Sequence, residues 1–310
     1  MRTLSALTVV ALCACEGTWV ANVPPPPPRA SSAVAIEKVF EASKTVPYAV
    51  WSSTIDHTAW VKEGQLHWLS ATGRGVLPLP EGITRAVDAA DGQGWALTSA
   101  LELFELTLAG AQVVPSPPRP LHASSRVHAF GRDTLITLTP FTGDTERPAA
   151  VCVWHARRWA CTVYATQAGV IEPDGREPGT AETFVFHHVE GTERVNVRFT
   201  VATGATERLT EDSPTRALRQ GDQLDRAGQP PLVLSTTATQ VRLDCYKPRG
   251  LAVLCGQTAH VAEVVFSEPT ADGLREVAHA RVDAPLSTLR RHGPFLVSFT
   301  LDHGFIISMP

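Results

Sequence analysis

Hydrophobic and polar residues alternate over short runs along most of the chain, and helical periodicity is almost absent. From about residue 33 onward these runs are rich in β-branched, aromatic and leucine residues, and clusters of Gly, Pro, Asp, Asn or Ser separate them. Typical runs are 58–61, 65–69, 94–98, 102–106, 134–138 and 295–299. Period-two patterns of this length are typical of half-buried strands, so the pattern predicts an all-β domain.

The runs also repeat. Trp60 and Trp95 lie 95 − 60 = 35 residues apart and open matching units. Each unit continues with a second strand that holds Trp68 or Phe104, a glycine turn, and a Val-Leu-Pro-Leu-Pro or Val-Val-Pro-Ser-Pro segment. A repeat of about 40 residues with several strands per unit predicts a β-propeller, in which each blade buries its faces against its neighbours.

The number of blades follows from where the second strand of each unit begins. Candidate second strands begin near residues 60, 95, 134, 184, 232, 261 and 295, a mean step of (295 − 60)/6, or about 39. Seven blades are favoured and six are possible, because the stretch 230–268 is crowded. Residues 33–40 alternate in pattern and can supply the outermost strand of the last blade, which would remove an open edge. A pair of β-sandwiches is the competing architecture.

The N-terminus has a different character from the rest of the chain. Arg2 precedes an apolar run that ends in Leu12-Cys13-Ala14-Cys15, and five prolines follow at 24–28. The run is too short to span a bilayer, and the tetrapeptide resembles the lipobox of bacterial lipoproteins. The alternatives are an ordinary secretory peptide and a buried N-terminal strand.

The lipoprotein resemblance implies cleavage before Cys15 and attachment of a diacylglyceryl group to its thiol. We therefore expect a signal peptide at 1–14, a lipidated and proline-rich tether at 15–32, and a propeller domain at 33–310. The resemblance places the protein in the cell envelope, lipid-anchored. Glu16 favours the outer membrane, because lipoproteins held at an inner membrane tend to carry Asp there.

Charge excludes one class of partner. The chain has 27 basic and 31 acidic residues and a net charge of −4, with no basic face, so we expect no nucleic-acid binding. With 44% hydrophobic and 19% charged residues, the composition is that of a folded globular protein.

Four cysteines remain once Cys13 is removed with the signal peptide and Cys15 is lipidated: Cys152, Cys161, Cys245 and Cys255. If residues 156–157 form a two-residue turn, Cys152 faces Cys161 on a non-hydrogen-bonded pair, where a cross-strand disulfide fits. Ala-Arg is a poor sequence for such a turn, so a four-residue loop is the alternative. Cys245 and Cys255 flank a second turn, off-centre, and this pairing requires a bulge. Two disulfides fit an oxidising compartment.

The remaining chemistry is sparse. His187 and His188 are adjacent in a strand-like run, so their side chains point to opposite faces and cannot share a metal. The other histidines are scattered singly: His57, His67, His122, His128, His155, His260, His279, His292 and His303. Asp174-Gly175 lacks the spacing of a calcium loop and is interpreted as a turn. The tryptophans are interpreted as core residues, with a sugar-stacking surface as the alternative. We therefore predict no catalytic residues, no metal and no cofactor.

These features favour a monomeric, membrane-tethered propeller that is non-catalytic and presents loops to an envelope protein or polysaccharide. The alternative is an extracytoplasmic glycan-binding or hydrolytic propeller, with carboxylates assembled from different blades. A cluster of carboxylates or histidines at the mouth of the central channel would remove the main support for the non-catalytic role.

Overall fold

The computed structural model describes residues 19–20, 31–41, 50–80, 84–131, 133–143, 149–163, 171–177, 182–190, 192–210, 218–246, 254–282, 284, 286, 288–300 and 303–310. These residues form strands and turns, and no helix among them is long and apolar enough to cross a membrane. Cys15 and most of the tether lie outside the described residues.

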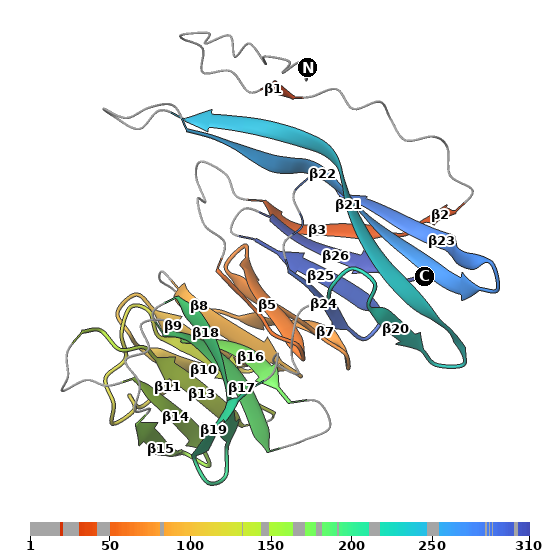
Figure 1. Cartoon of the computed structure of the whole chain (residues 1–310). Helices are drawn as coiled ribbons and strands as arrows, with labels where there is room; N and C mark the ends of the chain where they lie inside the picture. Colours follow the sequence, from red (N-terminus) through yellow and green to blue (C-terminus); the bar gives the residue numbers. More distant parts are fainter. Residues whose placement is uncertain are drawn as a thin grey trace.

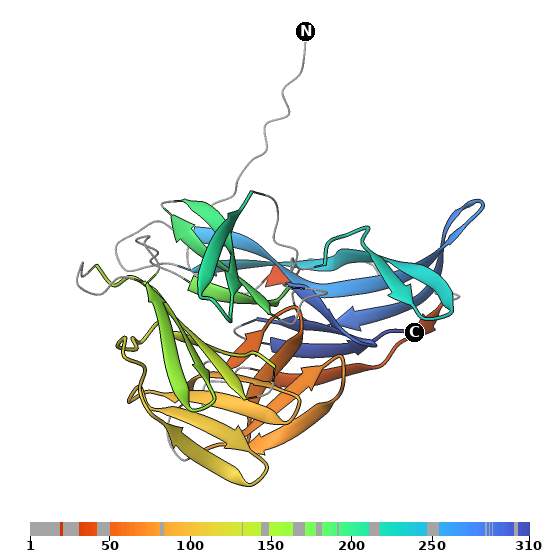
Figure 2. The ribbon, with the colours of Figure 1, turned by 90° about the horizontal axis from the view of Figure 1, so that it is seen from below.

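The described strands form six sheets that follow one another in chain order, so the protein is an all-β propeller (Figures 1 and 2). Consecutive strands pair antiparallel within each blade, and β2 (Ser32–Ala33) adds a short parallel strand beside β23. Blades one to three are β4 (Trp51–Ser53), β5 (His57–Lys62), β6 (Gln65–Ser70) and β7 (Arg74–Pro78); β8 (Thr84–Ala90), β9 (Gln93–Thr98), β10 (Leu103–Thr107) and β11 (Gly110–Val114); and β12 (Arg126–Ala129), β13 (Thr134–Thr139), β14 (Ala150–His155) and β15 (Arg158–Val163). Blades four to six are β16 (Ile171–Arg176), β17 (Thr183–Glu190), β18 (Glu193–Thr200) and β19 (Ala205–Leu209); β20 (Gln223–Arg226), β21 (Gln229–Tyr246), β22 (Leu254–Thr270) and β23 (Gly273–Val282); and β24 (Leu289–His292), β25 (Phe295–Phe299), β26 (His303–Ser308) and β3 (Ile36–Glu41).

The sequence repeat corresponds to the blades. Trp60 and Trp95 lie on the second strands β5 and β9, and Trp68 and Phe104 lie on the third strands β6 and β10. The Val-Pro segments overlap or follow the fourth strands. The predicted all-β propeller is confirmed.

The favoured number of blades was wrong: the described residues form six sheets, which was the alternative. The expected strands near 232 and 261 are parts of β21 and β22, which are 18 and 17 residues long. These two strands pair with each other as one hairpin, so they belong to one blade and not to two. A strand pattern this long has the same local appearance as two short strands, and only their pairing with each other shows that they form one sheet.

The predicted closure by the N-terminal segment is confirmed. β3 pairs antiparallel with β26, with Ile36 opposite Ile307 and Phe40 opposite Gly304. The last sheet therefore has three strands from the end of the chain and one from its beginning, which joins blade six to the N-terminal part of the domain.

Buried side chains join neighbouring blades. Apolar clusters lie between blades one and two, two and three, three and four, five and six, and six and one. Trp60, Trp68, Trp95 and Trp154 are buried in these clusters, and Trp159 packs against one of them. These tryptophans hold blades together, as the core interpretation predicted.

The first predicted disulfide is present. Cys152 lies opposite Cys161, and their Sγ atoms are 2.05 Å apart. The turn has two residues, Ala156 and Arg157, both with positive φ (49° and 61°), so the two-residue register holds despite an unfavourable turn sequence.

The β21–β22 hairpin extends beyond the other strands of blade five. β20 pairs with β21 only as far as Val233, and β23 pairs with β22 only from Ala262 onward. The projecting part, residues 237–246 and 254–261, is called the arm here (Figure 1). Its backbone register places Cys245 opposite Cys255, with a register irregularity near Gln240. The second disulfide stays a prediction that this register favours.

Candidate functional site

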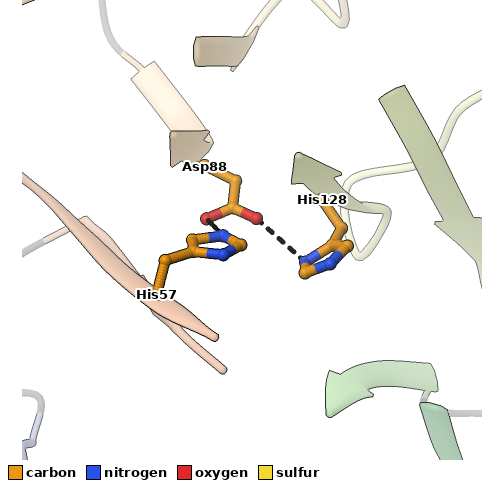
Figure 3. Close-up of side chains that lie close together, drawn as sticks. All are labelled: His57, Asp88 and His128. Carbon is orange, nitrogen blue, oxygen red and sulfur yellow. Dashed lines mark hydrogen bonds and ion pairs between the residues drawn. The ribbon is translucent and has the colours of Figure 1, made fainter. Parts of the chain in front are cut away.

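A cluster of ionisable side chains lies between the second strand of blade one and the first strands of blades two and three. His57 begins β5, Asp88 lies in β8, and His128 lies in β12 (Figure 3). All three side chains are 0–1% exposed. Three successive blades therefore each place one polar side chain in the same buried volume.

Asp88 is the hub of this cluster. Its Oδ1 lies 2.8 Å from His57 Nε2, and its Oδ2 lies 2.9 Å from His128 Nδ1. The backbone N–H groups of Ala89 and Ala129 donate to the same two oxygens at 3.1 and 2.9 Å. A buried carboxylate needs this many donors to offset the loss of its hydration, and here the donors come from three blades.

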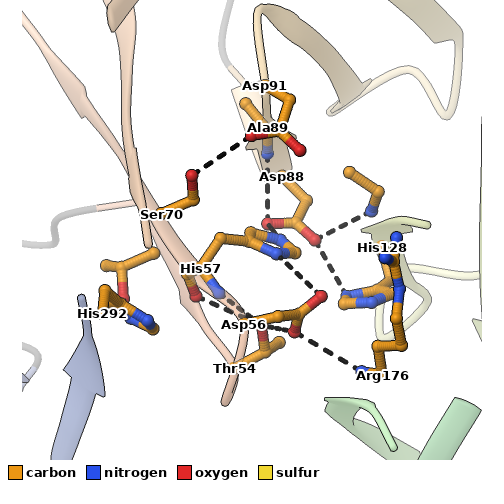
Figure 4. Close-up of polar contacts among 12 residues, drawn as sticks. Thr54, Asp56, His57, Ser70, Asp88, Ala89, Asp91, His128, Arg176 and His292 are labelled. Atoms are coloured by element: carbon orange, nitrogen blue, oxygen red, sulfur yellow. Dashed lines mark hydrogen bonds and ion pairs between the residues drawn. The ribbon is translucent and has the colours of Figure 1, made fainter. Parts of the chain in front are cut away.

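Further polar groups surround the hub (Figure 4). Asp56 Oδ2 lies 3.3 Å from His57 Nδ1, on the side away from Asp88. His292 of blade six is 1% exposed, and its Nε2 lies 2.8 Å from the Thr58 hydroxyl. His57 thus lies between two carboxylates, whereas His292 faces a neutral hydroxyl.

These surroundings shift the pKa values in opposite directions. Burial alone would lower the pKa of His57, but the carboxylates of Asp88 and Asp56 outweigh burial and raise it well above 6.5. Burial raises the pKa of a carboxyl group, yet the neighbouring imidazoles hold the pKa of Asp88 below its usual range. For His292 burial dominates and lowers the pKa to about 3. His57 is therefore an imidazolium and His292 a neutral imidazole near neutral pH.

A second polar group comes from blade four. β16 contains a bulge at Asp174, between Pro173 and Gly175, and the Asp174 side chain is buried. Arg194 Nη2 donates to both of its carboxylate oxygens, at 3.1 and 3.3 Å, and His187 Nδ1 lies 3.2 Å away. Bulges redirect side chains in this way. The interpretation of Asp174-Gly175 as a turn was wrong, because both residues lie within a strand.

Blade one contacts blade four directly, although two blades separate them in chain order. The Ile55 N–H donates to the Asp174 carbonyl at 3.0 Å, and the Arg176 N–H donates to Asp56 Oδ1 at 3.4 Å. The loop between β4 and β5 therefore contacts β16.

The two adjacent histidines behave as predicted. His187 is partly exposed and contacts Asp174, whereas His188 is fully buried, 3.5 Å from Glu190. His303 is the first residue of β26. Cys15 lies outside the described residues, so its lipidation stays a prediction.

Sequence reasoning missed the His57–Asp88–His128 cluster, because it searched for ligands two or four residues apart. These residues lie 31 and 128 − 88 = 40 residues apart, which is about one blade per step. A search for polar residues that recur at the blade period would have found them.

The cluster can hold a cation. His57, Asp88 and His128 each offer a ligand atom of a type that metals bind, and these atoms lie within 4.8 Å of one another. In this structure Asp88 forms a hydrogen bond with His57 Nε2 and an ion pair with His128 Nδ1. Burial separates the three side chains from any large substrate, so the cluster does not present its carboxylate to solvent.

No family model matches this chain, and no curated protein matches it. Solved structures similar to it include YCF48 bound to a D1 peptide, with 9% identity, a TM-score of 0.47, and coverage of 92% of this chain and 97% of that one. The WD40 β-propeller domain of Doa1 has 7% identity and a TM-score of 0.42, covering 90% and 97%. BamB from Moraxella catarrhalis has 11% identity and a TM-score of 0.35, covering 83% and 82%. The propeller assignment rests on the sheets themselves, and these likenesses concern the fold alone.

The opposite pKa shifts predict a stability optimum near neutral pH in chelator-treated protein. Because the folded pKa of His57 is raised, its contribution is complete below about 6.5 and is lost as the pH rises through the folded pKa. Because the folded pKa of His292 is lowered, the unfolded chain binds the extra proton, and stability falls as the pH drops from 6.5 toward 3. Each limb has a slope of at most about 1.4 kcal/mol per pH unit.

Urea unfolding at a series of pH values measures both limbs. His57→Gln should flatten the alkaline limb, and His292→Gln should flatten the acid limb, each leaving the other limb in place. Unchanged slopes in both variants would show that these two groups do not control the pH dependence.

Proposed function

We propose that this protein is a lipid-anchored, extracytoplasmic propeller that acts as a scaffold and holds a protein partner by strand addition to its arm. The observation that carries this proposal is the projection of the arm beyond the ring. The pairing of β21 with β20 ends at Val233, and the pairing of β22 with β23 begins only at Ala262, so neither flanking strand of blade five pairs with the arm. Unpaired strand edges expose backbone donors and acceptors that can pair with an extended segment.

The edge of β21 accepts a strand in this structure. β1 (Trp19–Val20) pairs antiparallel with the arm, with Trp19 opposite Leu243 and Val20 opposite Arg242. In the described part of the chain, β1 is the only further strand that pairs with the arm. A partner segment that pairs in the same way would extend this contact along the edge.

The test is a variant without the arm. Ala238 and Ala262 are Cα partners, so residues 239–261 can be replaced by Asn-Gly, a sequence suited to a two-residue hairpin turn. A partner captured in stoichiometric amount by the tagged, detergent-solubilised protein should be lost from this variant. Leu274→Asn, at a side chain 62% exposed on β23, is the control and should retain it. Retention by the armless protein, or purification of a monomer with nothing bound, argues against the scaffold.

The lipid anchor has its own test. Cys15→Ala removes the thiol that the lipobox resemblance assigns to diacylglyceryl transfer, so the protein should move from the membrane fraction to the soluble fraction. Cys13→Ala, two residues earlier, is the control and should remain in the membrane fraction. Membrane fractionation of Cys15→Ala without a change in mobility would exclude lipidation at this residue.

The polar group in blade four favours a second candidate, a propeller that binds or hydrolyses a glycan around Glu172, Asp174 and His187, because His187 contacts both carboxylates there. Asp174 is, however, already held by Arg194, and the tryptophans named above hold blades together. Hydrolysis of an envelope polysaccharide by the wild type, lost in Asp174→Asn, would support this candidate over the scaffold.

A further inference from the structure

The His57–Asp88–His128 cluster has the donor set of a metal site. We propose that it binds one divalent transition-metal ion of the zinc type, as a structural ion that ties together blades one, two and three. The three ligand atoms lie within 4.8 Å of one another. Two imidazoles and a carboxylate are ligands that zinc takes in proteins. The inference is independent of the scaffold proposal.

Binding requires small movements of the three side chains. Ligands that share one tetrahedral ion at about 2.0–2.2 Å lie roughly 3.3–3.6 Å apart. The contacts from the Asp88 carboxylate to His57 Nε2 and His128 Nδ1, at 2.8 and 2.9 Å, would therefore lengthen, and the ligand atoms, which lie within 4.8 Å of one another, would close around the ion. In the metal-free form Asp88 hydrogen-bonds to His57 Nε2 and forms an ion pair with His128 Nδ1. Binding would replace any proton on a coordinating nitrogen with a bond to the ion and release that proton to solvent, and each ring would carry its remaining proton on the other nitrogen.

Neighbouring groups orient two of the three proposed ligands, His57 and Asp88. Asp56 Oδ2 lies 3.3 Å from His57 Nδ1, so a proton on that nitrogen leaves the Nε2 lone pair directed toward Asp88. Backbone N–H groups of Ala89 and Ala129 fix the orientation of the Asp88 carboxylate. A carboxylate behind a ligating histidine is a common feature of zinc sites.

An independent observation concerns His128. Its side chain is 0% exposed, and neither Nδ1 nor Nε2 has a hydrogen-bond partner among the described residues; Nδ1 contacts Asp88 Oδ2 only as an ion pair, at 2.9 Å. The ring packs between the rings of His57 and Phe184, at centroid distances of 5.1 and 4.7 Å. Hydrogen bonding therefore leaves this buried imidazole unsatisfied, and coordination would give its Nδ1 a strong bond.

Burial also indicates what the ion would do. The cluster is closed to solvent, so an ion would be taken up during folding and would link three successive sheets. Three protein ligands leave a fourth coordination position, and burial leaves that position to water or to the second Asp88 oxygen and closes it to a large substrate.

The experiment uses the full-length protein in detergent, unfolded with EDTA and refolded with or without Zn²⁺. After desalting, elemental analysis should find one zinc per chain, and the refolded zinc form should unfold at a higher temperature. The double variant His57→Gln/His128→Gln should hold no stoichiometric zinc, whereas His122→Gln, at an exposed loop histidine, should hold one.

A second measurement does not depend on the folding of a variant. Refolding the wild type with Co²⁺ should produce visible absorption bands of a four- or five-coordinate ion, and one equivalent of Zn²⁺ should abolish them. Absence of stoichiometric metal from the wild type, or zinc retained by a folded double variant, would overturn the proposal. The cluster would then be a network of hydrogen bonds and ion pairs without a metal.

Discussion

Replacing Asp88 with asparagine is expected to lower the free energy of unfolding by about 3–5 kcal/mol, because the change breaks a buried ionic network without removing its partners. The four donors around the carboxylate would face an amide that accepts through one oxygen only. Its NH₂ group would lie against N–H donors, and His57 would lose the stronger of its two carboxylate contacts.

Urea unfolding of chelator-treated protein at neutral pH measures this loss without a contribution from metal. Asp133→Asn is the matched control, because Asp133 is exposed and has a φ of 59°, which asparagine tolerates. The control should change stability by less than about 0.5 kcal/mol. A loss below about 1 kcal/mol in Asp88→Asn would show that the hub does not hold the blades together.

Gly175→Ala is expected to lower stability by about 2–5 kcal/mol, because a side chain at this position is both strained and obstructed. Gly175 has a φ of +122°, and an added Cβ would lie 2.5 Å from Asp56 Oδ1, 3.0 Å from Ile55 Cγ2 and 3.1 Å from Thr54 Cβ. The backbone strain contributes about 1–3 kcal/mol, and overpacking contributes a similar amount. The substitution would also push apart the contact between blades one and four.

Gly273→Ala separates these two effects. Gly273 has a φ of +127°, and no atom lies within 4 Å of an added Cβ, so this variant carries only the backbone strain. Thermal unfolding of the two variants should therefore differ, with the larger loss in Gly175→Ala. Equal losses would mean that the loop from blade one does not press on β16.

Structural features that depend on residues close together in the sequence could be predicted. The two-residue turn at 156–157 and the pairing of Cys152 with Cys161 follow from counting outward along two alternating strands, because register is set by the turn. The N-terminal strand could be predicted because the last blade ends one strand short and 33–40 has a matching pattern.

Features that depend on which segments meet could not be predicted. The crowded stretch from 230 to 268 is compatible with two blades or with one long hairpin, and the choice depends on the pairing between β21 and β22. The bulge at Asp174 is equally hidden, because Asp-Gly is a turn sequence in isolation and here is held in a strand by its pairing with β17.

The sequence by itself determined the all-β class, the repeating blade, the closing strand and one disulfide, since each of these depends on alternation and spacing along a single stretch of chain. Only the tertiary structure decided the six sheets of the described residues, the arm, and the meeting of His57, Asp88 and His128. Each of these three lies about one blade from the next, and the packing of three successive blades brings their ligand atoms within 4.8 Å of one another. Burial then gives them their chemistry, because a low-dielectric environment strengthens charge interactions that the same residues would not show in an unfolded chain.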